Sequence, residues 1–137
     1  MTTSDRIILD TNTIVSALLL PTSVPRQAFD QAFDSGVVIV SEATVAELAD
    51  VLQRSRFDKY VREEARLHFL ATFTRDTTLI AVTETITDCR DPKDNKFLEV
   101  AVSAQATIII TGDRDLLDLH PYRGIAIMTP RDFMNRS

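Results

Sequence analysis

Two acidic residues come at or shortly after the ends of apolar stretches that lie far apart in the sequence. Asp10 follows the run Ile7–Leu9, and Asp113 follows Ile108–Ile110 within the letters TGD. Continuous β-branched runs of this kind are typical of buried parallel strands. The carboxyl ends of parallel strands meet at one rim of a sheet, where open α/β sheets bind their ligands. If the two strands are neighbours, we expect the two carboxylates to face each other, although each acid could simply cap the helix that follows it.

A third acid, Asp94, is placed by helical periodicity. In the predicted helix 93–105, a rotation of about 100° per residue aligns Asp94 with a buried stripe. The other members of that stripe are Phe97, Leu98, Ala101 and Gln105. Lys96 and Glu99 fall on the opposite side, which we expect to be solvated. Asp91, Pro92 and Asp94 also suit the N-cap, N1 and N3 positions of a helix, and Asp94 can do both.

A fourth acid, Glu47, lies at the edge of an apolar stripe in the predicted helix 42–54, beside Val51. Ser41 is a suitable N-cap for this helix. A glutamate at such a boundary is more often an ordinary solvated residue. Glu47 is therefore a candidate only in combination with the other three acids.

Together Asp10, Glu47, Asp94 and Asp113 would form a carboxylate cluster, with Asp115 close enough to join it. Clustered carboxylates repel one another unless cations compensate their charge. Oxygen ligands without His or Cys suit Mg²⁺ or Mn²⁺. Acidic pockets of this type hold one or two such ions and promote in-line displacement at phosphorus. The pattern therefore predicts metal-dependent cleavage of a phosphodiester.

The net charge of −5 at first argues against a nucleic-acid partner. Without the four candidate acids, however, 15 basic residues are balanced by 16 acidic ones. The basic residues form two groups, each of which could also be a plain solvated helix face: Arg54, Arg56, Lys59, Arg62 and Arg66; and Arg90, Lys93 and Lys96. The second group flanks Asp94, so we expect it to be the one that contacts RNA phosphates.

The 137 residues predict a single domain over residues 1–137, with 45% hydrophobic and 26% charged residues and no visible linker or repeat. The segment MTTSDRIILD lacks the basic and apolar regions of a signal peptide, and no apolar run is long enough to span a bilayer. The single Cys89 excludes an internal disulfide, so we expect a cytoplasmic location.

Alternating strand and helix patterns predict the α/β class, with a parallel sheet covered on both faces. The expected strands are 7–9, 37–40, 79–82, 107–110 and 125–128. The expected helices are 14–20, 26–33, 42–54, 59–73 and 93–105. The helix 59–73 has apolar residues on two sides, Tyr60 and Leu67 on one and Phe69 and Phe73 on the other, which indicates either a partner surface or simple burial.

Three motifs make the chain resemble the PIN-domain family: ILDTNTIVSALL, DPKDNKFLEVA and TGDRDLL, which occur in that order and span essentially the whole sequence. The resemblance is closest to the small, single-domain prokaryotic branch that comprises toxins of toxin–antitoxin systems (VapC-like proteins). It implies a three-layer α/β/α sandwich with about five parallel strands and the activity of a Mg²⁺- or Mn²⁺-dependent endoribonuclease. It also implies a homodimer and an antitoxin partner whose C-terminal segment lies in the active-site groove.

The resemblance assigns a role to each acid. The catalytic and metal-binding acids of the family fall on Asp10, Glu47, Asp94 and Asp113. The small polar residue after the first acid falls on Asn12, which is expected to orient Asp10 or a metal-bound water. Asp115 falls on a position that is acidic in some members and is expected to support the site.

Two other functions fit parts of the pattern. A haloacid-dehalogenase-type phosphatase would use Asp10 of the letters DTNT as nucleophile, with Asp113 and Asp118 as metal ligands. Asn12 cannot replace the acid/base aspartate of that mechanism, however, and Asp94 would have no role. A non-catalytic PIN-like module that binds RNA or protein is the second alternative. Such a module would be expected to have lost site acids, whereas all four are present.

Overall fold

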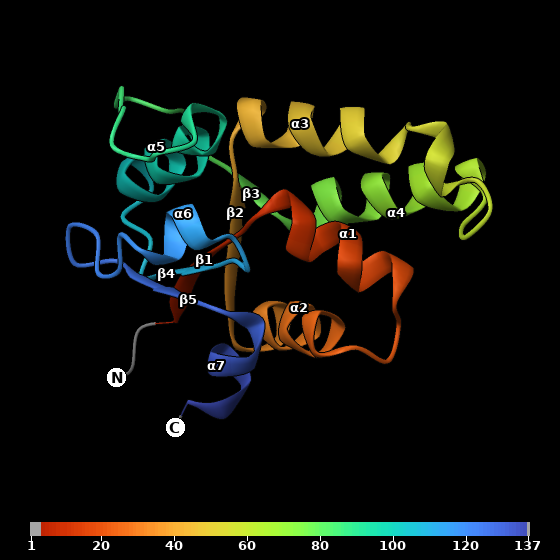
Figure 1. The fold of residues 1–137 in the computed structure, drawn as a ribbon, viewed down its shortest axis with the longest axis horizontal. Coiled ribbons are helices and arrows are strands. Elements are labelled where there is room, and N and C mark those ends of the chain that lie inside the picture. Colours follow the sequence, from red (N-terminus) through yellow and green to blue (C-terminus); the bar gives the residue numbers. More distant parts are fainter. Residues whose placement is uncertain (1–3, 137) are drawn as a thin grey trace.

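The computed structural model describes residues 4–136 and contains, in that range, a five-stranded parallel sheet in the order β3-β2-β1-β4-β5 (Figure 1). Residues 1–3, the start of the segment judged not to be a signal peptide, lie outside the described range. The strands are β1 (Asp5–Leu9), β2 (Gly36–Val40), β3 (Thr78–Leu79), β4 (Ile108–Ile110) and β5 (Ala126–Met128). Chain order runs one way from β1 through β2 to β3 and the other way from β4 to β5. The reversal therefore lies between β1 and β4.

Helices cover both faces of this sheet, as the α/β prediction requires (Figure 1). The α-helices are α1 (Thr11–Leu19), α2 (Val24–Ser35), α3 (Glu42–Leu52), α4 (Glu63–Asp76), α5 (Asn95–Ser103), α6 (Arg114–Leu117) and α7 (Pro130–Asn135). Short 3-10 turns η1 (Ser55–Phe57) and η2 (Pro92–Asp94) precede α4 and α5. Within the described range, no helix is long and apolar enough to cross a membrane.

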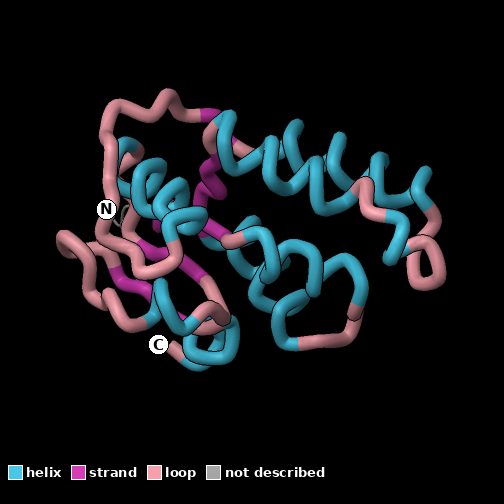
Figure 2. Tube along the Cα trace, turned by 45° about the horizontal axis from the view of Figure 1, so that its top comes forward, coloured by secondary structure: helices cyan, strands magenta, loops and turns pink. Residues whose placement is uncertain are grey.

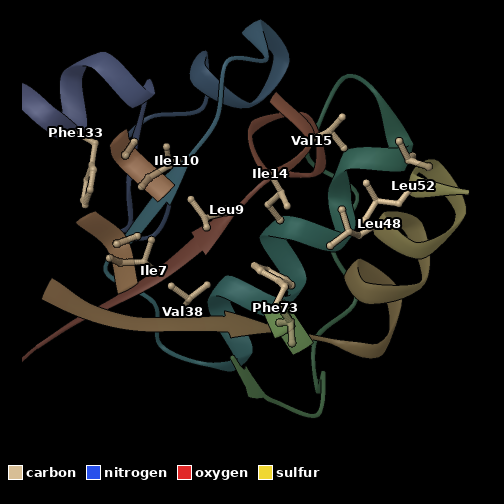
Figure 3. Packing of buried hydrophobic residues seen from close by; sticks show 14 of the residues in the cluster. Ile7, Leu9, Ile14, Val15, Val38, Leu48, Leu52, Phe73, Ile110 and Phe133 are labelled. Atoms are coloured by element: carbon tan, nitrogen blue, oxygen red, sulfur yellow. The ribbon is translucent and has the colours of Figure 1, made fainter. Parts of the chain in front are cut away.

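Alternate residues of the inner strands build two hydrophobic layers. On one face Ile7, Leu9 and Ile110 pack with side chains from α1, α3, α4 and α7 (Figure 3). On the other face Ile8 and Ile109 pack against side chains of α5. Because successive side chains of a strand point to opposite faces, the short apolar runs are buried on both sides. The three-layer α/β/α prediction is confirmed.

The third strand is shorter than expected. Strand character ends at Leu79 instead of continuing to residue 82, and the described stretch 80–91 contains no helix or strand (Figure 2). Side chains of α5 supply hydrogen-bond acceptors to this stretch: Ser103 Oγ accepts from Thr83 N at 3.0 Å, and Glu99 Oε2 accepts from Ile86 N at 3.0 Å. The prediction that Glu99 is a solvated surface residue is therefore wrong.

Helix α4 begins at Glu63, four residues later than expected, because the chain first makes η1 and a turn. Arg66 stabilises this connection with a side chain that is only 1% exposed. Its Nε donates to Leu52 O at 2.7 Å, its Nη1 donates to Val61 O, and its Nη2 donates to Asp58 Oδ1 at 2.9 Å. Arg66 consequently does not belong to a surface basic group, contrary to the sequence prediction.

The two sides of α4 differ in burial. Phe73 is buried and Phe69 stacks on Phe29 of α2 with 5.7 Å between the ring centroids. Tyr60, in the turn before α4, and Leu67 are exposed. Burial thus accounts for the phenylalanine side of the helix.

Candidate active site

The first two acids meet where the direction of the sheet order reverses. Strands β1 and β4 are neighbours with Leu9 opposite Ile110, and Asp10 N donates to Ile110 O at 3.2 Å. Asp10 is 4% exposed, and its Oδ1 accepts from Thr13 N at 2.8 Å, so it also caps α1. Burial raises the pKa of Asp10, opposed by hydrogen bonds from Thr111 and Thr13.

Thr111 connects these two acids. Its fully buried hydroxyl donates to Asp10 Oδ2 and accepts from Asp113 N at 2.9 Å. Because a hydroxyl has a single proton, the donation to Asp10 fixes its orientation. Sequence reasoning did not select Thr111. The available signal was its position, one residue past a buried strand and directly before the Gly112-Asp113 pair.

Asp94 and Asp113 place two carboxyl groups next to each other. Asp94 ends η2, directly before α5, and partial burial together with the neighbouring Asp113 raises its pKa to about 7. Among the described residues, Asp113 Oδ2 is a buried oxygen with no hydrogen-bond partner. Asp113 also precedes α6 without making a side-chain cap for it. Capping therefore explains Asp10 but not Asp113, and a cation would satisfy the unpartnered oxygen.

Glu47 reaches the site from α3 and is held by two donors. Lys96 Nζ lies 3.0 Å from Glu47 Oε1, with both side chains 23% exposed, and Thr11 Oγ1 donates to Glu47 Oε2. Lys96 was expected on the solvated side of its helix. It lies at the edge of that side, one turn before the buried Val100, and its long side chain spans from there to Glu47 of α3.

Helix α5, predicted to continue to residue 105, ends earlier. The last residue of α5 is Ser103, so Gln105 is not part of its buried stripe. Gln105 is exposed, with a positive φ of 54°. Phe97, Leu98 and Ala101 are buried as expected.

The acids surround one cavity of about 270 Å³. It is lined by Asp10, Thr11, Asn12, Glu47, Val51, Arg54, Asp91, Lys93, Asp94, Phe97 and Asp113. All four predicted acids are included, together with Asn12 and Lys93. Asp91, Thr11 and Arg54 also line the cavity, although none of them was selected from the sequence as a site residue.

The remaining predicted site residues lie outside this lining. Arg90 Nη1 is 3.5 Å from Asp115 Oδ1, and Arg90 Nη2 is 3.6 Å from Asp118 Oδ2. Asp115 is therefore paired with Arg90 and is not among the residues that line the cavity. Asn12 does line the cavity, but it does not make the expected contact to Asp10. Within residues 4–136, the hydrogen bonds to the Asp10 side chain come from Thr13 and Thr111.

The donor chemistry fits a hard divalent cation, although the acids are not arranged as a closed ligand set. Within the described range, no group of three or more His, Cys, Asp or Glu side chains is placed to hold an ion as it stands. The reason is visible in the contacts: Glu47 is engaged by Lys96 and Thr11, and Asp10 by Thr13 and Thr111. Asp94 and Asp113 remain as an oxygen-only pair with an unpartnered atom, which suits Mg²⁺ or Mn²⁺.

Comparison with known proteins identifies the family. A family model described as PIN domain matches residues 6–115. The chain belongs to the PIN domain family. It is 31% identical over 139 residues to the uncharacterized protein MJ1680 of Methanocaldococcus jannaschii, with 94% of this chain and 89% of that protein covered.

Solved structures share the fold of this PIN domain. VapBC2 from Rickettsia felis, bound to a DNA fragment from its promoter, has a TM-score of 0.62 at 13% identity and covers 90% of this chain and 98% of that chain. The PIN domain endonuclease Utp24 has a TM-score of 0.57 at 15% identity, with 90% and 84% covered. The phosphatase alternative has no support. The chain matches the PIN family, and Asp118, which that alternative used as a metal ligand, is paired with Arg90.

Proposed function

We propose that this PIN domain is a Mg²⁺- or Mn²⁺-dependent endoribonuclease that hydrolyses RNA phosphodiester bonds. The observation that carries the proposal is the cavity in which acids from four separate chain segments meet, with one buried carboxylate oxygen unpartnered among the described residues. No structural role explains the pair Asp94 and Asp113, whose mutual repulsion raises the cost of folding. A metal-binding role explains why such a pair is present.

In this proposal Asp94 and Asp113 hold the cation, and Asp10 and Glu47 complete its ligands. The bound ion supplies charge neutralisation and the activation of water against phosphorus. Thr111 keeps the Asp10 carboxylate in place from behind, as the partners of metal ligands commonly do. Lys93 and Arg54 lie on the cavity wall, where they can contact phosphates, and Asn12 can hydrogen-bond to a water molecule.

We further propose that the nuclease is the toxin of a toxin–antitoxin pair, acts in the cytoplasm and forms a homodimer. The fold similarity to VapBC2 supports the toxin role, and the fold similarity to the endonuclease Utp24 supports nuclease activity. The proposed partner is an antitoxin protein that covers the active-site cavity. The free, buried Cys89 is compatible with a reducing compartment.

The decisive experiment is RNA cleavage by the Asp94→Asn variant in Mg²⁺ and in Mn²⁺. The substitution changes charge but almost no volume, so the fold should persist by circular dichroism while turnover falls to the background. Glu84→Gln, at an exposed loop position, is the matched control and should cleave like the wild type. Wild-type cleavage rates in Asp94→Asn, or unchanged wild-type cleavage in excess chelator, would refute the metal-dependent mechanism. A wild-type protein that binds RNA without cleaving it would instead favour the non-catalytic alternative.

A further inference from the structure

Lys96 is placed where helix energetics disfavour a cation. It is the second residue of α5, and the positive end of the helix dipole lies in that first turn. Its side chain is nevertheless mostly buried and extends to α3, where Nζ lies 3.0 Å from Glu47 Oε1. The ion pair with Glu47, and not the stability of α5, therefore accounts for the position of this lysine.

The pair also affects the charge balance of the cavity. Within the part of the chain that the structure describes, Lys96 is the one cation within 4.0 Å of any of the four site acids. Among the described residues, no ion pair involves Asp10, Asp94 or Asp113. Lys96 thus neutralises one of the four carboxylates and occupies its Oε1, while Thr11 donates to Oε2.

Lys96 also borders a second, acidic groove. This groove of about 630 Å³ lies beside the cavity and is lined by Lys96, Glu42 and Glu99, among others. The two glutamates give this groove acidic side chains of its own, although Glu99 Oε2 already accepts from Ile86 N. An ammonium group that leaves Glu47 for this groove is therefore not an uncompensated charge in an apolar environment.

We propose that Lys96 is a positioning residue that occupies Glu47 in the metal-free protein and competes with the divalent cation for this carboxylate. This inference rests on the proposed metal-dependent function of the cavity. When the cation binds, Glu47 joins Asp94 and Asp113, and the ammonium group of Lys96 moves toward the adjacent groove. The lysine thereby stabilises the empty acidic cavity and sets how much free cation is needed to load it.

The test is the affinity of the purified full chain for Mn²⁺ alone, measured by isothermal titration calorimetry without RNA. Lys96→Met removes the competing charge and should bind Mn²⁺ more tightly than the wild type. Lys93→Met is the matched control, because Lys93 lines the acidic cavity but has Asp91 as its ion-pair partner, at 3.8 Å. Both variants lose one positive charge, so the long-range electrostatic gain is common to them. Competition predicts that Lys96→Met gains roughly twofold to fivefold more affinity than Lys93→Met, the range of a partly exposed ion pair.

A second comparison removes the carboxylate. In the Glu47→Gln background there is no charge to compete for, so the additional gain of Lys96→Met over Lys93→Met should disappear. Lys96→Arg keeps the cation and should bind Mn²⁺ like the wild type, which separates loss of charge from damage to the fold. Equal affinities of Lys96→Met and Lys93→Met, or weaker binding by Lys96→Met, would overturn the competition while leaving the metal site intact. A wild type without measurable Mn²⁺ binding would overturn the proposed function as well.

Discussion

Replacement of Asp113 by asparagine in the metal-free protein should stabilise the fold while it abolishes metal binding. Partial burial, and next Asp113, raise the pKa of Asp94 from 3.8 to about 7. Taken in full, that pKa shift lowers the free energy of unfolding by about 4 kcal/mol at neutral pH. Part of this free energy is due to burial and not to Asp113, and solvent screens the partly exposed carboxyl group. The destabilisation that Asp113 itself causes is therefore roughly 1 kcal/mol. For a chain of this length, the variant should melt about 3 to 4 °C higher.

The pH dependence gives the sign of this effect. Since the folded-state pKa of Asp94 is raised, the native protein binds more protons than the unfolded chain between about pH 4 and pH 7. Stability of the wild type is lost as pH rises through this window. Asp113→Asn removes part of the shift, so its advantage should be largest at pH 8 and should shrink toward pH 4.

The assay is thermal unfolding in chelator and low salt, followed by circular dichroism at pH 4, 6 and 8. Glu84→Gln removes the same formal charge from an exposed loop and should change the melting temperature little at any pH. The reasoning is refuted if Asp113→Asn melts below the wild type at pH 8, or if its advantage is independent of pH. Addition of Mn²⁺ should then raise the melting temperature of the wild type but not of the variant.

Three further predictions follow from the contacts. Saturating Mg²⁺ or Mn²⁺ should stabilise the wild type by roughly 1 to 3 kcal/mol through linkage, a gain that melting curves in chelator should lack. Arg66→Met leaves the carbonyls of Leu52 and Val61 without their donor and should cost about 3 kcal/mol in urea unfolding, whereas exposed Arg62→Met should cost less than about 0.5 kcal/mol. Thr111→Val keeps the side-chain shape but removes the hydrogen bond to Asp10 Oδ2. RNA cleavage should therefore fall about tenfold to a hundredfold, with recovery in Thr111→Ser. Wild-type cleavage in Thr111→Val would contradict the positioning role.

Local sequence patterns were sufficient for the fold class and for the strands that carry the site. Runs such as Ile7–Leu9 and Ile108–Ile110 are buried on both faces, so their composition alone identifies central parallel strands. The acids at or shortly after the ends of these runs then had to lie at the same rim. The edge strand was predicted less well. Ile80 N still donates to Val40 O of β2, but the N–H groups of Thr83 and Ile86 hydrogen-bond to side chains of α5 instead of to a strand partner.

The sequence by itself determined the alternation of strands and helices, the membership of the PIN family and the candidate acids, since all three depend on residues close together in the chain. Only the tertiary structure decided which partner each side chain has. Lys96 binds Glu47, 49 positions away in the sequence, and Thr111 binds Asp10, 101 positions away. The buried Arg66 donates to a backbone carbonyl that no periodicity of the sequence predicts. Such contacts depend on how helices and strands pack, and a pattern of neighbouring residues contains no information about a distant partner.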